Sequence, residues 1–428
     1  MKMRRIDRAS GGFALVITIT LMALLILAVC ALSALVGVNG QIATVTSAQT
    51  RAHQNALLGL AIGTSDLQRF AGPDNRVTGM AGITGIPANA ASTTRNWCGV
   101  WSDDGSFLGW FTSGAESTGA AALKVGAVPI KLVGDGVNGG AGSVGASAAH
   151  SEHVIAGKVA IVATGAPGTP ATATTIGSYA FLVTDEGVKV SAYARPSELA
   201  IPGVKPQLTS TNAASAQGKL RAALDSYAAK LPALLTYEQL SLLPTPFPAL
   251  TQSVLQDNFH HVTLTAGSVE GSQVFSGMIN LNTASPYVWR SVLETYNSVA
   301  GVTPISSADL SLLGANLAAQ FAASASNKAA GGPFTSVAGF GASALLAGNL
   351  PATITPPEFM AAIGAMLGVR SDTFRVRAYG EATRAIDGSI EAVAYCEAVL
   401  QRISAAAPNA LGRQFVMKQF RWLGPDDI

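Results

Sequence analysis

GFALVITITLMALL, residues 12–25, is the stretch that decides how this chain can fold. It belongs to an uncharged and mostly aliphatic run that extends from Phe13 to Val38. As a helix the run would be roughly 39 Å long, and the hydrocarbon core of a bilayer is about 30 Å thick. Basic residues precede the run, between Lys2 and Arg8, and no charged residue follows it until Arg51. The positive-inside rule therefore predicts a single-pass membrane protein with a cytoplasmic N-terminus, whose remainder lies outside.

The helical pattern continues beyond the apolar run. A polar but helix-compatible stretch reaches about Phe70, and the break Gly72-Pro73-Asp74 follows it. The apolar residues of this stretch have helical spacing: Leu57, Leu58, Ala61, Ile62 and Leu67. We therefore expect one long helix, residues 13–72, half suited to lipid and half amphipathic. A cleaved secretory signal would have a shorter apolar region, and a plain signal anchor would leave the junction Gly11-Gly12-Phe13 unexplained.

The order of basic leader, glycine, phenylalanine and apolar span resembles the class III signal of type IV prepilins. In that family a prepilin peptidase cuts after the glycine and methylates the new N-terminus, so the resemblance implies a leader, residues 1–12, that is cut between Gly12 and Phe13. Major pilins carry a glutamate at the fifth mature position, where this chain has Ile17. Within the resemblance, the absence of that acid is typical of the K-type minor pseudopilins of type II secretion and of related pilus-assembly proteins.

The resemblance also implies a location and partners. It implies anchoring in the inner membrane, with the head in the periplasm or in an extracellular fibre. Other pilin-like subunits are the expected partners of the N-terminal helix, and the prepilin peptidase is the expected processing enzyme.

The part after the helix divides into three blocks. Residues 73–212 read as the first part of a β-rich head, because the aromatic segments Asn96–Trp101 and Phe107–Phe111 flank turn residues and the segments Val154–Val162 and Tyr179–Ala194 have strand character. Residues 213–370 have helical periodicity, for example from Leu310 to Phe321. Residues 371–428 return to strand patterns: Phe374–Tyr379, Ile390–Ile403 and Phe415–Trp422, with a turn at Asp387-Gly388. The expected fold is therefore α+β, a β-rich head with an inserted helical domain.

This order strengthens the resemblance, because the sheet of K-type minor pseudopilins is interrupted by a helical domain. The segment Ile279–Ser285, INLNTAS, resembles the Asn-Thr-Ala segment of that insertion. The segments WCGVW at residues 97–101, DEGVK at 185–189 and FRWLGPDDI at 420–428 resemble the cassette A family of pilin-like proteins from Verrucomicrobia. Cys98 departs from the pattern of that family, so the resemblance assigns no role to its thiol.

Composition excludes one class of partner and leaves one disulfide open. Lys plus Arg (27) nearly balances Asp plus Glu (25), and no long basic run is present, so nucleic acid is not expected as a partner. Of the three cysteines, Cys30 lies in the apolar run. Cys98 and Cys396 lie in strand-like segments of the head, and we predict that they pair, the alternative being two buried thiols.

Candidate sites for metal or catalysis each have an ordinary explanation. The histidines His150, His153, His260 and His261 are expected as solvated loop residues rather than zinc ligands. The acidic pairs Asp103-Asp104 and Asp426-Asp427 are expected as turn and tail charges rather than calcium ligands. Asp185-Glu186 with Lys189 could serve acid–base catalysis in a pocket, but a hairpin turn with a local salt bridge is the favoured interpretation.

The remaining polar and aromatic candidates are interpreted in the same way. Asn280, Asn282 and Thr283 precede Ser285 and Pro286, which suit the N-cap and first position of a helix. The tryptophans are expected in the core or at domain contacts rather than as carbohydrate platforms: Trp97, Trp101, Trp110, Trp289 and Trp422.

The sequence therefore predicts no catalytic residue, no metal and no cofactor. It predicts a non-enzymatic minor subunit, at the tip of a type IV pilus or type II secretion pseudopilus or initiating its assembly. The alternative is an extracytoplasmic enzyme or carbohydrate-binding protein on a plain signal anchor.

Overall fold

The computed structural model describes residues 11–84, 94–116, 124–125, 128–133, 137–138, 141–142, 154–163, 174–192, 205–209, 212–227, 250–264, 269–270, 273–274, 278–323, 333–424 and 427. Its helices are α1 Gly11–Ala71, α2 Ala216–Tyr227, α4 Gln252–Asn258, α5 Pro286–Asn297, α6 Ser307–Ala323, α7 Val337–Gly341, α8 Ala344–Asn349 and α9 Pro356–Ile363, with 3-10 turns η1 Ala81–Thr84, η3 Gly364–Met366 and η4 Pro408–Ala410. The strands of the larger sheets are β1 Arg76–Met80, β2 Cys98–Ser102, β3 Phe107–Trp110, β10 Val159–Ala163, β11 Thr174–Asp185, β18 Thr373–Thr383, β19 Ile390–Ala406 and β20 Arg413–Leu423. Two-stranded pairs are formed by β4 Ala115–Glu116, β5 Lys124–Val125, β6 Pro129–Val133, β7 Val137–Asn138, β8 Ala141–Gly142, β9 Val154–Gly157, β12 Val190–Ser191, β13 Val262–Thr263, β14 Val269–Glu270, β15 Gln273–Val274, β16 Ile279–Asn280 and β17 Leu367–Gly368.

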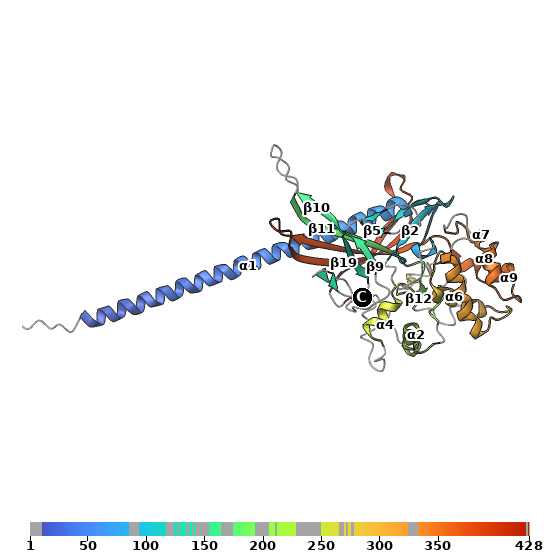
Figure 1. The fold of residues 1–428 in the computed structure, drawn as a ribbon, viewed down its shortest axis with the longest axis horizontal. Coiled ribbons are helices and arrows are strands. Elements are labelled where there is room, and N and C mark those ends of the chain that lie inside the picture. The colour runs from blue at the N-terminus through green and yellow to red at the C-terminus, as the bar shows by residue number, and fades with distance from the viewer. Residues whose placement is uncertain are drawn as a thin grey trace, which may run out of the picture.

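The helix α1 is the longest element, and its first half projects far beyond the rest of the molecule (Figure 1). It begins in the glycine pair before the apolar run and ends at Ala71. Gly72 and Pro73 follow, and the proline ring has no backbone N–H to extend the helix. This confirms the expectation of one long N-terminal helix that continues past the apolar run.

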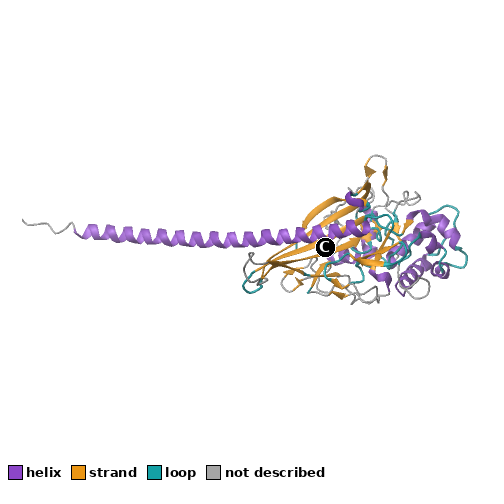
Figure 2. Cartoon of the chain, turned by 90° about the horizontal axis from the view of Figure 1, so that it is seen from above, coloured by secondary structure: helices purple, strands orange, loops and turns teal. Residues whose placement is uncertain are grey.

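The head contains a five-stranded antiparallel sheet with the order β10-β11-β18-β19-β20. β11 and β18 pair from Gly177 opposite Ala382 to Asp185 opposite Phe374. Along the chain, helices α2 to α9 lie between β11 and β18. In space, they gather mainly at the end of the head away from the free half of α1 (Figure 2). The α+β fold is thus confirmed: a long apolar N-terminal helix precedes a β-rich head with helices inserted between two strands of one sheet.

Side chains alternate between the two faces of the sheet and so build two cores. On β18, Phe374, Val376 and Ala378 face α1 and belong to a core that also contains small residues of that helix. The neighbouring Tyr379 belongs to the other core, where the inserted helices contribute Trp289, Phe321 and Phe340 as packed rings. The sheet is therefore covered by α1 on one face and mainly by the insertion and smaller sheets on the other.

The aromatic hairpin forms where the sequence predicts it. β2 and β3 pair antiparallel around Asp103-Asp104, and Gly105 has a positive φ of 86°, which its missing Cβ permits. The Asp104 carboxylate accepts a hydrogen bond from the Ser106 backbone N–H at 2.8 Å. These two aspartates are turn residues, as expected.

The predicted strand Tyr179–Ala194 is wrong in its bounds. β11 starts earlier, at Thr174, and ends at Asp185, whose side chain accepts a hydrogen bond from the Gly187 N–H at 2.7 Å and so turns the chain. Val190 and Ser191 then pair in parallel with Val262 and Thr263. The segment 186–189 is a turn but not the hairpin that the sequence suggested, because β12 leaves the sheet of β11 and joins the insertion.

Candidate functional site

The free half of α1 is an apolar surface without a partner in the isolated chain. From Phe13 to Ser47 every side chain is exposed, and 18 consecutive residues of the helix reach a mean hydropathy of 3.0. The helix is long and apolar enough to cross a membrane. Large aliphatic side chains that face water on all sides cost free energy, so this half needs lipid or other helices around it.

The other half of α1 packs on the sheet through small side chains. Ala48, Ala52, Ala56, Leu60 and Ala71 are buried, at spacings that place them on one face. The backbone of Gly380 lies directly against the backbone of Ala52 and Ala56, where an added Cβ would lie 2.3 Å from the Ala52 carbonyl oxygen and 2.1 Å from the Ala56 nitrogen. Small residues on both sides therefore allow helix and sheet to approach closely.

The residues of the predicted cleavage site lie at the free end of this helix. Gly12 is the second residue of α1, and Phe13 and Ile17 follow it with exposed side chains. Ile17 therefore presents an aliphatic side chain on the exposed half of the helix. The structure leaves the predicted cleavage after Gly12 as a prediction.

The predicted disulfide is absent, because Cys98 and Cys396 are separate buried thiols. Cys98 on β2 neighbours Phe111, Phe111 neighbours Val183 on β11, and β18 then separates β11 from β19, which carries Cys396. Four strand spacings of about 4.8 Å therefore stand between the two residues, whereas a disulfide needs their Cα atoms within about 7 Å. Burial raises the pKa of both thiols, that of Cys396 to about 12, which keeps them protonated and poor nucleophiles.

The acid pair Asp185-Glu186 leads into a buried cluster of charges. Glu186 Oε1 accepts hydrogen bonds from Lys189 Nζ at 2.6 Å and from Arg375 Nε at 3.2 Å. Arg375 Nη1 also donates to Glu397 at 2.6 Å, and Arg377 Nε donates to the other oxygen of Glu397 at 2.8 Å. The cluster thus joins the turn after β11 to β18 and β19.

Further groups enclose the cluster. Thr263 Oγ1 donates to Glu186 Oε2 at 2.5 Å, and Arg421 Nε donates to Glu397 at 3.0 Å. The Arg377 guanidinium and the Lys189 ammonium lie 4.4 Å and 4.6 Å from the centroid of the Phe259 ring, where they make cation–π contacts. Burial alone would raise the pKa of Glu186, but Lys189 and Arg375 outweigh it and lower the pKa to about 2. The carboxylate is ionised and fully buried, so it serves as a structural anchor rather than as an accessible general base.

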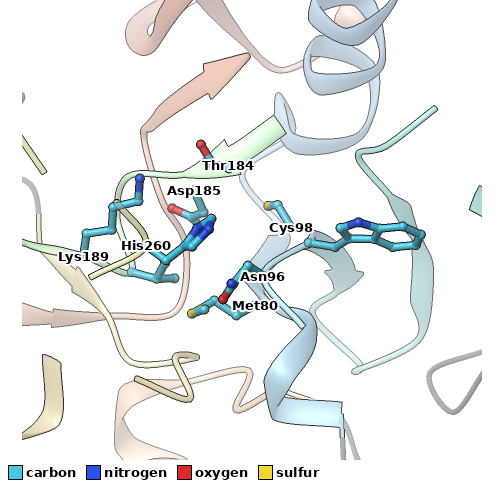
Figure 3. A pocket seen from close by; sticks show the side chains of 9 residues that line it. Met80, Asn96, Cys98, Thr184, Asp185, Lys189 and His260 are labelled. Carbon is cyan, nitrogen blue, oxygen red and sulfur yellow. The ribbon is translucent and has the colours of Figure 1, made fainter. Parts of the chain in front are cut away.

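A small pocket lies next to this cluster, and Figure 3 shows that side chains from several elements line it. Asp185 and Lys189 contribute from the turn after β11, Cys98 from β2 and His260 from the segment after α4. Among the residues that the structure describes, no three His, Cys, Asp or Glu side chains lie together as metal ligands would. The pocket therefore offers neither a reactive thiolate nor a metal ligand set within the described part.

His260, His261, Asn280 and Asn282 of the insertion are buried, and hydrogen bonds link the asparagines to distant segments of the chain. His260 and His261 are buried, which corrects the expectation that they are solvated, and His261 Nδ1 lies 2.9 Å from Ser285 Oγ. Asn280 donates to the Thr78 carbonyl at 2.8 Å, and Asn282 accepts from the Phe334 N–H at 2.9 Å. Sequence reasoning missed these two connections, because each partner lies far away in the chain.

Three further expectations concern the helix cap at Ser285, the histidines His150 and His153, and the acidic pair near the C-terminus. Ser285 caps α5 by accepting from the Val288 N–H, and Pro286 is the first residue of the helix, as predicted. His150, His153 and Asp426 lie outside the described residues. Asp427 accepts a hydrogen bond from the Gly424 N–H at 2.7 Å, which suits a tail charge.

Four tryptophans are buried or half-buried, as expected, but Trp422 is not a core residue. Its side chain is 41% exposed on the edge strand β20, where it contacts the ring of His53 on α1 at 4.4 Å between centroids. Phe420 lies beside it at 5.4 Å. Trp422 is therefore a contact residue between β20 and α1, which is the second place expected for a tryptophan, because β20 ends the sheet and one face of its aromatic side chains stays open next to α1.

Comparison with known proteins gives one structural likeness. No protein-family model matches the chain, and no curated protein matches it. The structure is similar to a chain of the GspK-GspI-GspJ complex from the type 2 secretion system of enterotoxigenic Escherichia coli, with 13% sequence identity and a TM-score of 0.30 over 57% of this chain and 80% of that chain. At that TM-score the likeness by itself decides neither the fold nor the function.

Proposed function

We propose that this protein is a minor pilin-like subunit of a type IV pilus or a type II secretion pseudopilus. The observation that carries the proposal is the division of α1 into an exposed apolar half, Phe13–Ser47, and a half that packs on the sheet through small residues. A subunit that is stored in the membrane and later joins a helix bundle needs this division. Its exposed half must contact first lipid and then neighbouring helices, while the other half packs on the subunit's own head. The N-terminus is cytoplasmic and the head is periplasmic or extracellular.

The role of the head is assembly rather than catalysis. The chemistry-bearing residues Asp185, Glu186 and Lys189 are buried and engaged in tertiary contacts. Cys98 and Cys396 are buried with raised pKa values. These observations support a non-enzymatic subunit, whose partners are other pilin-like subunits.

Ile17 supports a place at the tip or at the start of assembly. Inside an apolar helix bundle a carboxylate at this position could neutralise the amino terminus of a neighbouring subunit, and an unpaired charge there is costly. An isoleucine cannot do so. A subunit inserted once, with the fibre growing beneath it, loses little by this substitution.

Cleavage of the leader tests the proposal. Gly12→Leu should leave residues 1–12 attached, because the peptidase needs a residue without a side chain before the cut. Gly11→Leu is the matched control, since it places the same side chain one residue earlier and keeps Gly12. Mass spectrometry of the N-terminus in cells with a prepilin peptidase should find a methylated Phe13 in the wild-type protein and the control, and Met1 in Gly12→Leu.

An intact leader in the wild-type protein would overturn the proposal. That result would favour the alternative, an extracytoplasmic enzyme or carbohydrate-binding protein on a plain signal anchor.

A further inference from the structure

The hairpin between β18 and β19 ends in an exposed aliphatic residue. The turn is well ordered by hydrogen bonds: the Arg384 N–H donates to Ser389 O at 2.8 Å and the Gly388 N–H donates to Arg384 O at 2.9 Å. Ile386 at the tip is 93% exposed. Tight turns usually carry polar residues and glycine, so a fully exposed isoleucine at such a place needs an explanation.

The tip points along α1 towards its free half. α1 and β18 run antiparallel, since Gly63 lies against Val376, Gly59 against Ala378 and Ala56 against Gly380. Three strand residues, to Thr383, and then three residues of the turn lead from Gly380 to Ile386. They extend at most about 20 Å, which corresponds to about 11 to 13 helix residues at about 1.5 Å each. The tip is therefore level with about residues 41–45 of α1. Figures 1 and 2 show hairpin ends of the sheet at the end of the head from which α1 emerges.

This level coincides with the edge of the apolar run. The uncharged aliphatic run of α1 ends at Val38. The tip lies about 5 to 10 Å beyond that residue along the helix axis, and one headgroup layer of a bilayer is about 5 to 8 Å thick. If Val38 lies at the outer boundary of the hydrocarbon core, Ile386 lies at the level of the outer headgroups.

Charges around the tip balance one another. Arg384 pairs with Glu391 at 3.1 Å and with Asp387 at 3.6 Å, and Arg51 pairs with Glu391 at 3.1 Å. Two cations face two anions, so the surface has no net attraction for anionic lipid. The contact that fits this tip is apolar.

We propose that the β18–β19 tip is a membrane contact of the head, in which Ile386 inserts among the lipid headgroups beside α1. The contact would fix the height and tilt of the head while the subunit is stored in the membrane. This inference rests on the proposed membrane anchoring by α1. It adds a second attachment point, which the extraction of the subunit into a fibre must release.

Fluorescence quenching in vesicles tests the contact. The full chain with Cys30→Ala and Ile386→Cys is labelled with an environment-sensitive fluorophore and placed in phosphatidylcholine vesicles that carry nitroxides on the headgroup or deep in the acyl chain. Cys98 and Cys396 are buried and do not compete for the label. Leu312→Cys on α6 is the matched control, since Leu312 is an exposed aliphatic residue, at 58%, on a helix at the far end of the head.

Headgroup nitroxides should quench the probe at position 386 several-fold more than the probe at position 312, with or without anionic lipid. The fluorophore is itself apolar, so a label-free comparison accompanies it. Hydrogen exchange of the turn amides in vesicles should be slower in the unlabelled wild-type chain than in Ile386→Ser. Equal exchange, or equal quenching at positions 386 and 312, contradicts the inference.

A probe on the native Cys30 separates this inference from the anchoring proposal. Deep nitroxides should quench it, because Cys30 lies within the apolar run. If they quench Cys30 and position 386 behaves like position 312, only the membrane contact of the tip fails. If Cys30 is not quenched, α1 does not span the bilayer and both proposals fail.

Discussion

Glu186 makes contacts with both the insertion and the sheet. Its carboxylate accepts from Lys189 in the same turn, from Thr263 on β13 and from Arg375 on β18. A buried charge is tolerated only when such partners replace the lost water, and removal of one partner leaves the others uncompensated. One of the contacts that dock the helical insertion on the sheet therefore depends on the ionised form of this side chain.

This dependence predicts how stability changes with pH. The pKa of Glu186 is lowered from 4.5 to about 2 in the folded protein, so its contribution is fully present above about pH 4.5 and is lost as the pH falls towards about 2. A shift of this size corresponds to about 3 kcal/mol of unfolding free energy. Glu186→Gln should flatten the decline in unfolding free energy over this range, measured by chemical denaturation in detergent solution.

Glu391→Gln is the control, because that carboxylate pairs with Arg51 and Arg384 at the surface. Surface pairs contribute at most about 1 kcal/mol, so the slope with pH should stay close to that of the wild-type protein. A wild-type slope in Glu186→Gln would show that the cluster does not need this charge.

At this scale the sequence could predict only the local half of the cluster. Glu186 and Lys189 are three residues apart, and their ion pair was expected. Arg375 is 189 residues from Glu186, and nothing in its own strand pattern tells which carboxylate it meets. The same holds for Cys98 and Cys396, whose strand character is correct but whose distance depends on the order of strands in the sheet.

At the scale of elements, α1 approaches the sheet closely because glycines, which have no side chain, lie in the contact. Gly59 and Gly63 on the helix lie against Tyr179, Phe181 and Val376, and Gly380 on β18 lies against the helix backbone. A methyl group at position 380 would have to push the whole helix away, because the atoms it meets are backbone atoms that cannot rotate aside.

Gly380→Ala should therefore destabilise the docking of α1 by about 1 to 3 kcal/mol, the usual cost of overpacking. Gly109→Ala on β3 is the matched control, since it is also a strand glycine and its Cβ would meet nothing within 4 Å. Denaturation in detergent, with hydrogen exchange of residues 52–60 as a local readout, should separate the two variants. Equal stability of both would mean that the helix and the sheet accommodate a methyl group at position 380, which contradicts the tight contact.

Elements with a regular period were the predictable ones. α1, α6, β18 and β19 follow their apolar patterns along their lengths, and the turn at Asp387-Gly388 has the positive φ of a glycine turn. The strand predicted over Tyr179–Ala194 failed because its pattern is interrupted by a charged turn, and burial of those charges is decided by distant strands. For a related reason the sequence could not tell which of the two expected places Trp422 takes, since a strand pattern does not reveal which strand ends the sheet.

For the whole molecule, the bulky head and Ile17 together predict a low copy number. A subunit whose sheet carries an insertion from α2 to α9 has a head that is hard to place repeatedly within a shaft, and Ile17 gives no charge to a neighbour. Quantitative proteomics of purified fibres should find this chain far below the main shaft subunit, and its deletion should reduce the number of fibres. Shaft-level abundance is the result that contradicts a place at the tip.

The pairing of β11 with β18 also determines when the molecule can fold. A ribosome releases α1 first, but β18, β19 and β20, which make up most of the sheet that α1 covers, lie in the last sixth of the chain. Until that segment has emerged, the glycine and alanine face of the helix has only β11 of the sheet to pack on, and the buried arginines of β18 are still missing. Contacts between such distant segments form slowly. The contact between α1 and the complete sheet can therefore form only when synthesis is almost finished, and most of this helix face stays uncovered until then.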